Sequence, residues 1–334
     1  MSIPCTVLGA GSWGTALATQ LARLGHDVAI WSHDPAVVQG INEQHCNPRY
    51  LKDVALPENL RATMELHVSV ARARLLVPAV PSHALREVMT ACGSEVTSDT
   101  VVCCATKGIE NESLDTMADV LDHTLPERVH EAITILSGPS FALEVARGLP
   151  TAVAIAGHGE HAHFAAEAFH GDAFRCYTTE DVTGVCIGGS LKNVMAIACG
   201  VSDGIGLGLN ARAAIITRGL AELTRLATAM GANPLTMMGL AGVGDLVLTC
   251  TGDLSRNRRV GLALGRGQKL DEILEELGEV AEGVKTARSA RDLGQRVGVE
   301  LPITEQVYEL IYEDKPAAIG MMQLLQRARK EERG

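Results

Sequence analysis

The sequence has few aromatic residues and an excess of negative charge, and both features exclude broad classes of function. Phe, Trp and Tyr make up only 3% of the 334 residues, so the chain offers little surface on which nucleic-acid bases can stack. It has 29 Lys and Arg residues against 40 Asp and Glu residues, a formal net charge of −11. This balance is unfavourable for binding nucleic-acid backbones or anionic membranes. We therefore expect no nucleic-acid partner.

The sequence also lacks the marks of a membrane or secreted protein. It has no run of about 18 uninterrupted apolar residues, so we expect no transmembrane helix and no membrane insertion. Its first residues carry no basic region of the kind that begins a signal peptide. The nine cysteines are scattered, odd in number and without a Cys-x-x-Cys motif. Such cysteines indicate reduced thiols, and we expect a cytoplasmic protein.

The composition and patterning predict two domains. Apolar residues make up 46% and charged residues 21% of the chain, which excludes wholesale disorder. At about 150 residues per domain, the length corresponds to two domains. The first half alternates short apolar runs with helical stretches, which predicts an α/β fold with a doubly wound, mostly parallel sheet. From about Gly188 onward the spacing is helical, which predicts an all-α second domain.

The individual elements follow from the same patterns. The expected strands are residues 5–8, 28–31, 75–80, 100–105, 132–136, 151–156 and 174–177. Pro78 is an unfavourable residue inside the third of these strands, because proline cannot donate a ladder hydrogen bond. The expected helices are residues 15–24, 212–230, 270–277, 302–312 and 317–329.

A glycine-rich turn follows the first expected strand. Residues 9–14, Gly-Ala-Gly-Ser-Trp-Gly, fit the pattern G-x-G-x-x-G where a strand ends and a helix begins. Gly9 permits the tight turn, Gly11 lets the backbone approach a pyrophosphate, and Gly14 lets the helix pack on the strand. The N-terminus of that helix favours a bound phosphate. The pattern predicts a Rossmann dinucleotide site; the alternative is an ordinary glycine-rich turn.

The end of the second expected strand bears on the choice of dinucleotide. NAD-selective folds usually carry an acidic residue about 20 residues beyond the glycines. Ser32 and His33 stand at that place, with Asp34 beside them. A protonated histidine can pair with a 2′-phosphate, so the sequence favours NADP(H) or the use of both NADP(H) and NAD(H). The alternative is that His33 is a loop residue without a role.

Two lysines occupy positions where a ligand crevice is expected. Lys107 directly follows the strand 100–105, and the carboxyl ends of such strands face the crevice. Lys192 and Asn193 enter an otherwise apolar helix near the domain boundary. Burial there would lower the pKa of Lys192 and make it a general acid near neutral pH. The alternatives are a solvated Lys107 and a Lys192 whose ammonium reaches water.

Residues 255–259, Ser-Arg-Asn-Arg-Arg, group three arginines in an acidic protein. Guanidinium groups bind phosphate oxygens in bidentate fashion, and Asp245 upstream can orient a lysine or accept a substrate hydroxyl. An exposed basic turn or an intersubunit ion pair is the alternative reading of the arginines. His158, His161 and His163 lie in a polar stretch that we interpret as a solvated loop, and we expect no metal site.

Ordered segments of the chain resemble the bacterial NAD(P)-dependent sn-glycerol-3-phosphate dehydrogenases over nearly its whole length. These segments are residues 9–16, 105–108, 137–142, 191–194, 202–204, 244–246, 255–258 and 280–283. The resemblance implies a Rossmann domain over residues 1–188 that binds NADP(H) and/or NAD(H). It implies an all-α substrate and catalytic domain over residues 189–334. The implied reaction is the reversible reduction of dihydroxyacetone phosphate to sn-glycerol 3-phosphate, which supplies glycerophospholipid synthesis.

The resemblance also implies roles for individual residues. Lys192 looks like the family's proton donor to the carbonyl oxygen, and the other matching catalytic positions are Lys107, Asp245 and Asn193. The matching substrate-binding positions are Lys107, Gly138, Ser140, Lys192, Asp245, Ser255, Arg256 and Asn257. The matching cofactor-binding positions are Gly9, Gly11, Ser12, Trp13, Gly14, His33, Lys107, Ala142, Arg256, Val280 and Glu282. Thr249 is a further candidate for the active site, and Tyr50 for cofactor contact.

Two other functions fit parts of the pattern. A β-hydroxyacid dehydrogenase shares the glycine turn and a lysine at the domain boundary, but its substrates carry a carboxylate and need no phosphate. A dinucleotide-sensing regulator would bind the cofactor without turnover. An apolar helical domain can provide a subunit interface, and we expect a homodimer.

Overall fold

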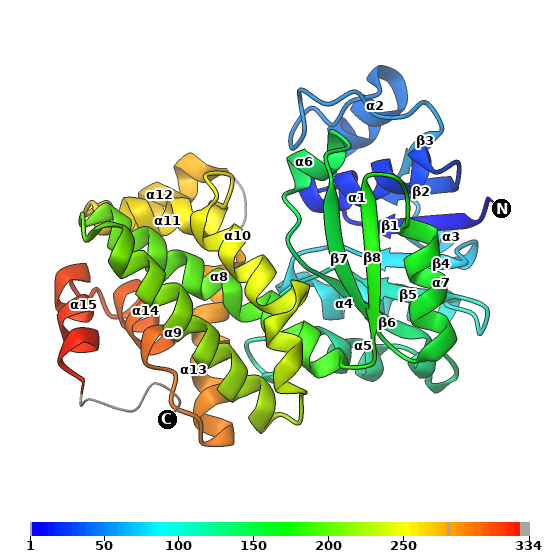
Figure 1. The fold of residues 1–334 in the computed structure, drawn as a ribbon. Coiled ribbons are helices and arrows are strands. Elements are labelled where there is room, and N and C mark those ends of the chain that lie inside the picture. Colours follow the sequence, from blue (N-terminus) through cyan, green and yellow to red (C-terminus); the bar gives the residue numbers. More distant parts are fainter. Residues whose placement is uncertain (1, 279–280, 328–334) are drawn as a thin grey trace.

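The structure, a computed structural model, describes residues 2–278 and 281–327. Figure 1 shows two lobes, one built on a β-sheet and one made of helices. The sheet has eight strands in the order β3-β2-β1-β4-β5-β6-β7-β8. The strands are β1 (Pro4–Leu8), β2 (Asp27–Trp31), β3 (Leu60–Thr63), β4 (Leu75–Pro78), β5 (Val101–Cys104), β6 (Ile133–Ser137), β7 (Thr151–Ala156) and β8 (Phe174–Thr179).

The sheet is mostly parallel, as predicted. β6 and β7 pair antiparallel, and the other neighbouring strands pair parallel. The order β3-β2-β1-β4-β5-β6 is that of a doubly wound sheet whose connections run outward from its centre. This arrangement confirms the α/β fold class and places the carboxyl ends of β1, β2, β4 and β5 along one edge.

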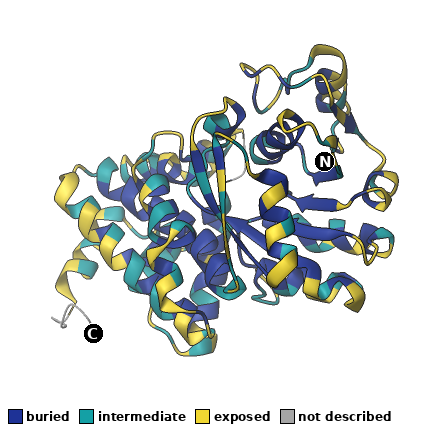
Figure 2. Cartoon of the chain, turned by 45° about the vertical axis from the view of Figure 1, so that its right-hand side comes forward, coloured by how far each residue is buried: buried dark blue, intermediate teal, exposed yellow. Residues whose placement is uncertain are grey.

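Helices cover both faces of the sheet, and successive strand residues point to opposite faces. Val7 lies in the core beneath one set of helices, and its neighbour Leu8 lies in the core beneath the other set. The first set is α1 (Ser12–Arg23), α2 (Pro35–Gln44), α6 (Ala142–Ala146) and α7 (Gly159–Phe169). The second set is α3 (Leu66–Ala71), α4 (Ser82–Cys92) and α5 (Met117–Thr124). Figure 2 shows most of the sheet buried, whereas β8 at its edge and the outer faces of the helices include exposed residues.

The structure differs from the sequence predictions at three places in this lobe. The edge strand β3 was not predicted. The strand expected to reach Val80 ends at Pro78, whose carbonyl accepts a hydrogen bond from the Ala105 N–H at 2.8 Å. The ending is physically favourable, because a terminal proline leaves no ladder donor missing. The interpretation of residues 158–163 as a loop was wrong, because His161 and His163 lie in α7.

The second lobe consists of helices from α8 onward. They are α8 (Val182–Gly204), α9 (Gly208–Ala229), α10 (Asp245–Thr251), α11 (Arg256–Gly265), α12 (Leu270–Leu277), α13 (Glu282–Val297), α14 (Pro302–Tyr312) and α15 (Ala317–Gln326). Between α9 and α10 lie two short turns, η3 (Pro234–Met238) and η4 (Leu240–Gly244). The helices predicted over 270–277 and 302–312 are confirmed at both ends.

The helix α8 is long and apolar enough, by length and composition alone, to cross a membrane. Its apolar residues do not form an uninterrupted run, because Ser190, Lys192 and Asn193 lie among them. Its most apolar stretch is 100% buried inside the protein, as is typical of the central helix of a globular lobe.

Four glycines bring α8 and α11 into direct backbone contact. A Cβ atom on Gly200 would lie 2.1 Å from the Arg258 carbonyl oxygen, and one on Gly261 would lie 2.0 Å from the Ile197 carbonyl oxygen. Gly204 and Gly265 make the same kind of contact one turn further along. Since real Cβ atoms cannot approach so closely, this pairing depends on glycine at these positions.

Candidate functional site

A cavity of about 800 Å³ lies between the two lobes, at the carboxyl ends of β1, β2, β4 and β5. A doubly wound sheet binds its ligands at this edge, in the crevice beyond the strand ends. The sheet lobe contributes the glycine turn and the segments after the strands, and the helical lobe contributes α8, α10, α11 and the start of α13. The predicted site residues that line it are Gly9, Gly11, Ser12, Trp13, His33, Lys107, Ser140, Ala142, Lys192, Asn193, Asp245, Ser255, Arg256, Asn257 and Glu282.

The glycine turn has the shape that a pyrophosphate requires. Gly9 has φ +107°, a conformation that side chains rarely adopt, and its N–H donates to the Trp31 carbonyl at 3.0 Å. Gly14 packs directly on the turn, because a Cβ there would lie 1.9 Å from the Gly9 carbonyl oxygen. At Gly11, by contrast, a Cβ would meet no protein atom within 4 Å. This open backbone faces the cavity at the start of α1, so the residues fit a bound dinucleotide.

The end of β2 forms the far wall of the cavity. His33 lines it, with its ring centroid 6.3 Å from that of Trp31. Asp34 caps α2 by accepting the Ala36 N–H, and Arg49 forms an ion pair with it at 3.1 Å. The hydrogen bond from Arg49 lowers the pKa of Asp34 below its usual value.

Trp13 links the glycine turn to Lys107. Its indole Nε1 donates to the Ala105 carbonyl at 3.2 Å, and Lys107 Nζ lies 5.7 Å from the centroid of its ring. The hydroxyl of Ser12 donates to the Tyr50 carbonyl at 3.4 Å. The start of α1 and the end of β5 therefore share one wall of the cavity.

A buried lysine and a half-buried lysine converge on one buried carboxylate. Lys192 Nζ lies 2.5 Å from Oδ1 of Asp245, and Lys107 Nζ lies 3.0 Å from Oδ2. Thr249 donates its hydroxyl to the Asp245 carbonyl at 2.6 Å. Asp245 is 0% and Lys192 7% exposed, which excludes the alternative that the Lys192 ammonium lies in bulk water. Lys107 comes from the sheet lobe, and Lys192 and Asp245 come from the helical lobe.

The environment of this cluster lowers the pKa of both groups, for different reasons. Burial lowers the pKa of Lys192 to about 7; the Asp245 carboxylate opposes this shift and the Lys107 charge adds to it. Burial acts to raise the pKa of Asp245, but the charges of Lys107 and Lys192 outweigh it and hold that pKa below its usual value. At neutral pH the site thus combines a fixed carboxylate with a lysine that can release or accept a proton.

The start of α11 faces the same cavity. Ser255 caps the helix by accepting the Arg258 N–H at 3.2 Å. Asn257 donates its amide to Oδ1 of Asn193 at 3.0 Å and accepts the Gly283 N–H at 2.9 Å. One asparagine therefore joins α8, α11 and α13, and Arg256 lines the cavity beside it.

The three arginines of this segment have different surroundings. Arg258 is buried and forms ion pairs with Asp203 at 2.8 Å and Asp253 at 2.7 Å. Its partners lie within this chain, so it is not an exposed basic residue. Arg256 and Arg259 line the cavity.

The turn after β6 forms part of the opposite wall. Gly138 has φ +141°, and its carbonyl accepts from Ser140 Oγ at 2.8 Å and from Lys107 Nζ at 3.4 Å. Ala142 lies at the start of α6 on the cavity surface. Glu282, the first residue of α13, accepts the Ser82 hydroxyl at 2.5 Å and so connects the lobes at the rim.

Two predicted residues do not line the cavity, and a third lies outside the described residues. Gly14 lies behind the turn, and Gly138 is buried beneath it. Val280 lies outside the described residues. Within residues 2–278 and 281–327, no three His, Cys, Asp or Glu side chains form a group that could hold a metal ion.

The cavity wall and its rim also contain polar residues that were not predicted as site residues, among them Arg49, Lys52, Ser82 and His83. Ser82 and His83 follow β4, and the rule that strand carboxyl ends face the crevice, which identified Lys107 after β5, applies to them equally. Arg49 and Lys52 stand on the segment before β3, where no motif marks them.

Comparisons with known proteins give a consistent result. Two family models match, the N-terminus of NAD-dependent glycerol-3-phosphate dehydrogenase over residues 4–163 and its C-terminus over residues 181–321. A glycerol-3-phosphate dehydrogenase (NAD(P)+) of Anaeromyxobacter dehalogenans is 53% identical over 98% of this chain and 99% of that protein. Its counterpart in Myxococcus xanthus is 52% identical over 98% of both chains. The crystal structure of glycerol-3-phosphate dehydrogenase from Coxiella burnetii superposes with a TM-score of 0.92, at 40% identity over 98% of this chain and 99% of that one.

Proposed function

Because the chain belongs to the NAD-dependent glycerol-3-phosphate dehydrogenase family, we propose that Lys192 donates the proton in its reaction. That reaction is the reversible reduction of dihydroxyacetone phosphate to sn-glycerol 3-phosphate with NAD(P)H. The observation that carries the assignment is the buried contact of Lys192 with Asp245 in a cavity that also contains the glycine turn and Arg256.

The cofactor binds along the sheet side of the cavity. The backbone of Gly9 and Gly11 at the start of α1 holds its pyrophosphate, and the contact of Gly14 with the turn keeps α1 in place. The further cofactor contacts in this proposal are Ser12, Trp13, His33, Lys107, Ala142, Arg256, Val280 and Glu282. When bound, the reduced nicotinamide supplies a hydride to the substrate carbonyl carbon. His33 lies where it can meet a 2′-phosphate, which supports the use of NADP(H) as well as NAD(H).

The substrate phosphate binds at the start of α11. Arg256 provides a guanidinium group, and Ser255 and Asn257 provide polar side chains beside it. Gly138 and Ser140 form the turn on the opposite side of the substrate. Fixing the phosphate in this way orients the carbonyl, and such positioning can contribute about 7–11 kcal/mol to lowering a barrier.

The lysines act on the carbonyl oxygen. Negative charge grows on this oxygen during reduction, and the ammonium of Lys192 stabilises it and then donates a proton to it. Asp245 accepts hydrogen bonds from both lysines and keeps Lys192 charged near neutral pH. Lys107 adds a second positive charge, and Asn193 is held toward the cavity by Asn257.

The decisive experiment follows nicotinamide absorbance over time with purified protein, dihydroxyacetone phosphate, and NADPH or NADH in parallel. Loss of absorbance is the expected outcome, and the ratio of the two rates reports the cofactor preference at His33. A protein that binds NADPH but does not turn over this substrate would contradict the assignment. Turnover of a hydroxy acid without phosphate would then favour a β-hydroxyacid dehydrogenase, and no turnover at all a dinucleotide sensor.

We further propose that residues 1–188 bind the cofactor and that residues 189–334 bind the substrate and carry the catalytic groups. The glycine turn in one lobe and Lys192, Asp245 and Arg256 in the other support this assignment.

We also propose a cytoplasmic homodimer. Exposed apolar side chains on the helical lobe, namely Leu209, Leu235, Met238 and Leu325, support the dimer. The nine cysteines, all of which are free thiols, support the cytoplasmic location. Light scattering in solution tests the dimer.

A further inference from the structure

The loop that follows β5 begins at the cavity and ends far from it. Lys107 stands at its start, where it contacts Asp245, and α5 begins at Met117. We call residues 107–116 the Lys107 loop. It belongs to the sheet lobe by sequence, but its apolar side chains pack elsewhere. Ile109 is 2% exposed and lies in the core of the helical lobe, and Leu114 packs against the same core. The two lobes therefore share this loop.

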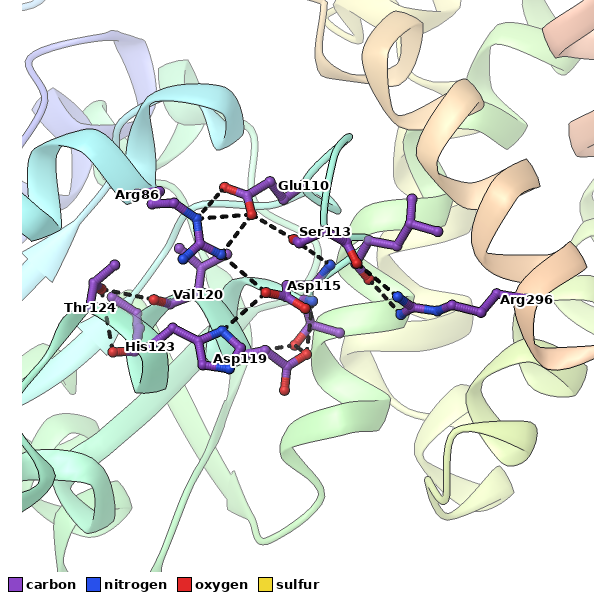
Figure 3. Close-up of polar contacts among 12 residues, drawn as sticks. Arg86, Glu110, Ser113, Asp115, Asp119, Val120, His123, Thr124 and Arg296 are labelled. Atoms are coloured by element: carbon purple, nitrogen blue, oxygen red, sulfur yellow. Dashed lines mark hydrogen bonds and ion pairs between the residues drawn. The ribbon is translucent and has the colours of Figure 1, made fainter.

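Hydrogen bonds from the helical lobe follow the loop backbone from one end to the other. The Ser190 hydroxyl of α8 accepts the Gly108 N–H at 3.1 Å, and the Ser289 hydroxyl of α13 donates to the Ile109 carbonyl at 3.1 Å. At the far end, Arg296 of α13 donates to the carbonyls of Ser113 and Leu114 at 2.7 and 3.2 Å. Figure 3 shows Arg296 reaching across from the helical lobe to this end of the loop.

Leu114 has an unusual backbone at the point that Arg296 holds. Its φ is +62°, in the left-handed region that non-glycine residues seldom occupy. The two carbonyls bound by Arg296 belong to the peptide planes on either side of the Leu114 Cα. One guanidinium group thus fixes both planes, and such strained residues persist only where the surroundings determine them.

The sheet lobe holds the same end of the loop from the other side. Arg86 of α4 donates to both carboxylate oxygens of Glu110 and, at 3.0 Å, to Asp115 (Figure 3). The Glu110 N–H donates to the Asp115 carbonyl, which closes the loop on itself. Arg86 of one lobe and Arg296 of the other therefore hold the same end of the loop, at a fixed place from which the chain leads back to Lys107.

We propose that Arg296 is a positioning residue for Lys107: by fixing the strained turn at Leu114 against the helical lobe, it sets where the loop places the Lys107 ammonium beside Asp245. This inference rests on the proposed roles of Lys107 and Lys192. Arg296 touches neither the cofactor nor the substrate, and it acts only through the loop. Ser289, which holds Ile109 closer to Lys107, acts in the same way.

The test compares the full-length wild type with Arg296→Ala, Arg296→Lys, Ser289→Ala and Arg291→Ala. Arg291 is the matched control, because it stands on the same helix but pairs with Glu305 of α14 and does not contact the loop. The measurements are kcat/KM for dihydroxyacetone phosphate, the pH profile of kcat for its reduction, and the thermal midpoint. Asp245 and Lys107 are the ionisable groups that shift the pKa of Lys192, and Lys192 in turn acts on Cys250; of these three partners only Lys107 lies on the loop.

We expect Arg296→Ala to lower kcat/KM at least about ten-fold, since small displacements of a catalytic group are costly. The pH at which reduction declines should also rise, because the Lys107 charge no longer lowers the pKa of Lys192. Arg296→Lys should bring kcat/KM and the pH profile part of the way back to their wild-type values. Arg291→Ala should lower the thermal midpoint without moving the pH profile.

Two results would overturn the proposal: a wild-type pH profile and kcat/KM in Arg296→Ala, or an equal shift of the pH profile in Arg291→Ala. Should Arg296→Ala not fold, Ser289→Ala gives the same readout, and an unchanged pH profile there overturns the proposal. A wild type that does not turn over dihydroxyacetone phosphate contradicts the proposed function instead, so the two failures are distinguishable.

Discussion

Lys192 and Asp245 form a buried ion pair, with Nζ of the lysine 2.5 Å from Oδ1 of the aspartate. Burial alone favours a neutral lysine, and the carboxylate opposes that effect. The balance between the two sets the pH range in which the lysine can act as an acid. Asp245 therefore governs the protonation of Lys192 as well as its position.

Replacing Asp245 by Asn should move the pH profile of reduction. The substitution removes the charge that raises the pKa of Lys192, so this pKa falls below its value of about 7. In the proposed mechanism reduction needs the protonated lysine, so kcat should decline at lower pH than in the wild type. The measurement is kcat against pH at saturating substrate. Asp253→Asn, at an exposed carboxylate that pairs with Arg258, should leave the profile in place; an equal shift there would contradict this account.

Lys192→Ala should remove turnover and keep cofactor binding. General acid catalysis contributes about 10²–10⁴-fold, and a comparable loss in kcat is expected. NADPH binding, followed by its fluorescence, should persist because the glycine turn is unchanged. Lys315→Ala, at a lysine that contacts Glu309 on α14, is the control and should keep its activity. Near-normal turnover of Lys192→Ala would rule out the assignment.

Arg256→Ala should weaken binding of the phosphate. Hydrogen bonds to charged groups contribute about 1.5–3 kcal/mol, which corresponds to a rise in KM for dihydroxyacetone phosphate of roughly ten-fold to a hundred-fold. Dihydroxyacetone, which lacks the phosphate, should be reduced with the same low efficiency by both proteins. If KM for the phosphorylated substrate stays at the wild-type value, Arg256 does not bind the phosphate.

Glu222 should make stability depend on pH. Its carboxylate is 2% exposed and accepts the N–H groups of Ile303 and Thr304 at the start of α14. Burial raises its pKa from 4.5 to about 7. The raised pKa means that its contribution is fully present below about pH 4.5 and is lost as the pH rises through 7. The size of this loss is roughly 3 kcal/mol.

Denaturant unfolding of the wild type and of Glu222→Gln, measured between pH 5 and pH 8, tests this contribution. The difference in unfolding free energy between the two proteins should change with pH in favour of the variant as the pH rises. A difference that stays constant across this range would show that Glu222 does not titrate there.

Gly261→Ala should destabilise the helical lobe. Its Cβ would lie 2.0 Å from the Ile197 carbonyl oxygen, and overpacking of this kind typically costs about 1–3 kcal/mol. The measurement is the midpoint of denaturant unfolding. Gly239→Ala is the control, because its backbone suits alanine and its Cβ would meet its nearest neighbour at 3.3 Å. Equal effects of the two substitutions would contradict the tight contact.

The sequence was most informative where local pattern decides structure. The helices over residues 270–277 and 302–312 have clear periodicity, and the second begins at Pro302, a favourable first residue. β3 was missed because Leu60–Thr63 is short, contains the exposed Arg61 and pairs only with β2 at the sheet edge. Such a strand depends on its neighbour rather than on its own residues.

The site was predictable in its parts but not in its contacts. The glycine turn and Lys107 follow from rules about strand ends, and local sequence also indicated His33, Lys192, Asn193, Asp245 and residues 255–259. The resemblance supplied the other residues. The contact between Lys107 and Asp245 spans 138 positions in the sequence, and no periodicity reports it. The polarity of Lys192 left both a buried and a solvated side chain open, and tertiary burial decided between them.

The glycine contact between α8 and α11 has a consequence for substrate selection. α8 carries Lys192 and α11 begins at Arg256, so direct backbone contact fixes the separation of the proposed proton donor from the proposed phosphate-binding group. At the four glycines the two backbones touch directly, and at the site Asn257 of α11 donates a hydrogen bond to Asn193 of α8. A phosphorylated ketone with one carbon more between its phosphate and its carbonyl would place its oxygen beyond Lys192. The paired helices thus select substrates by the distance between the phosphate and the carbonyl group.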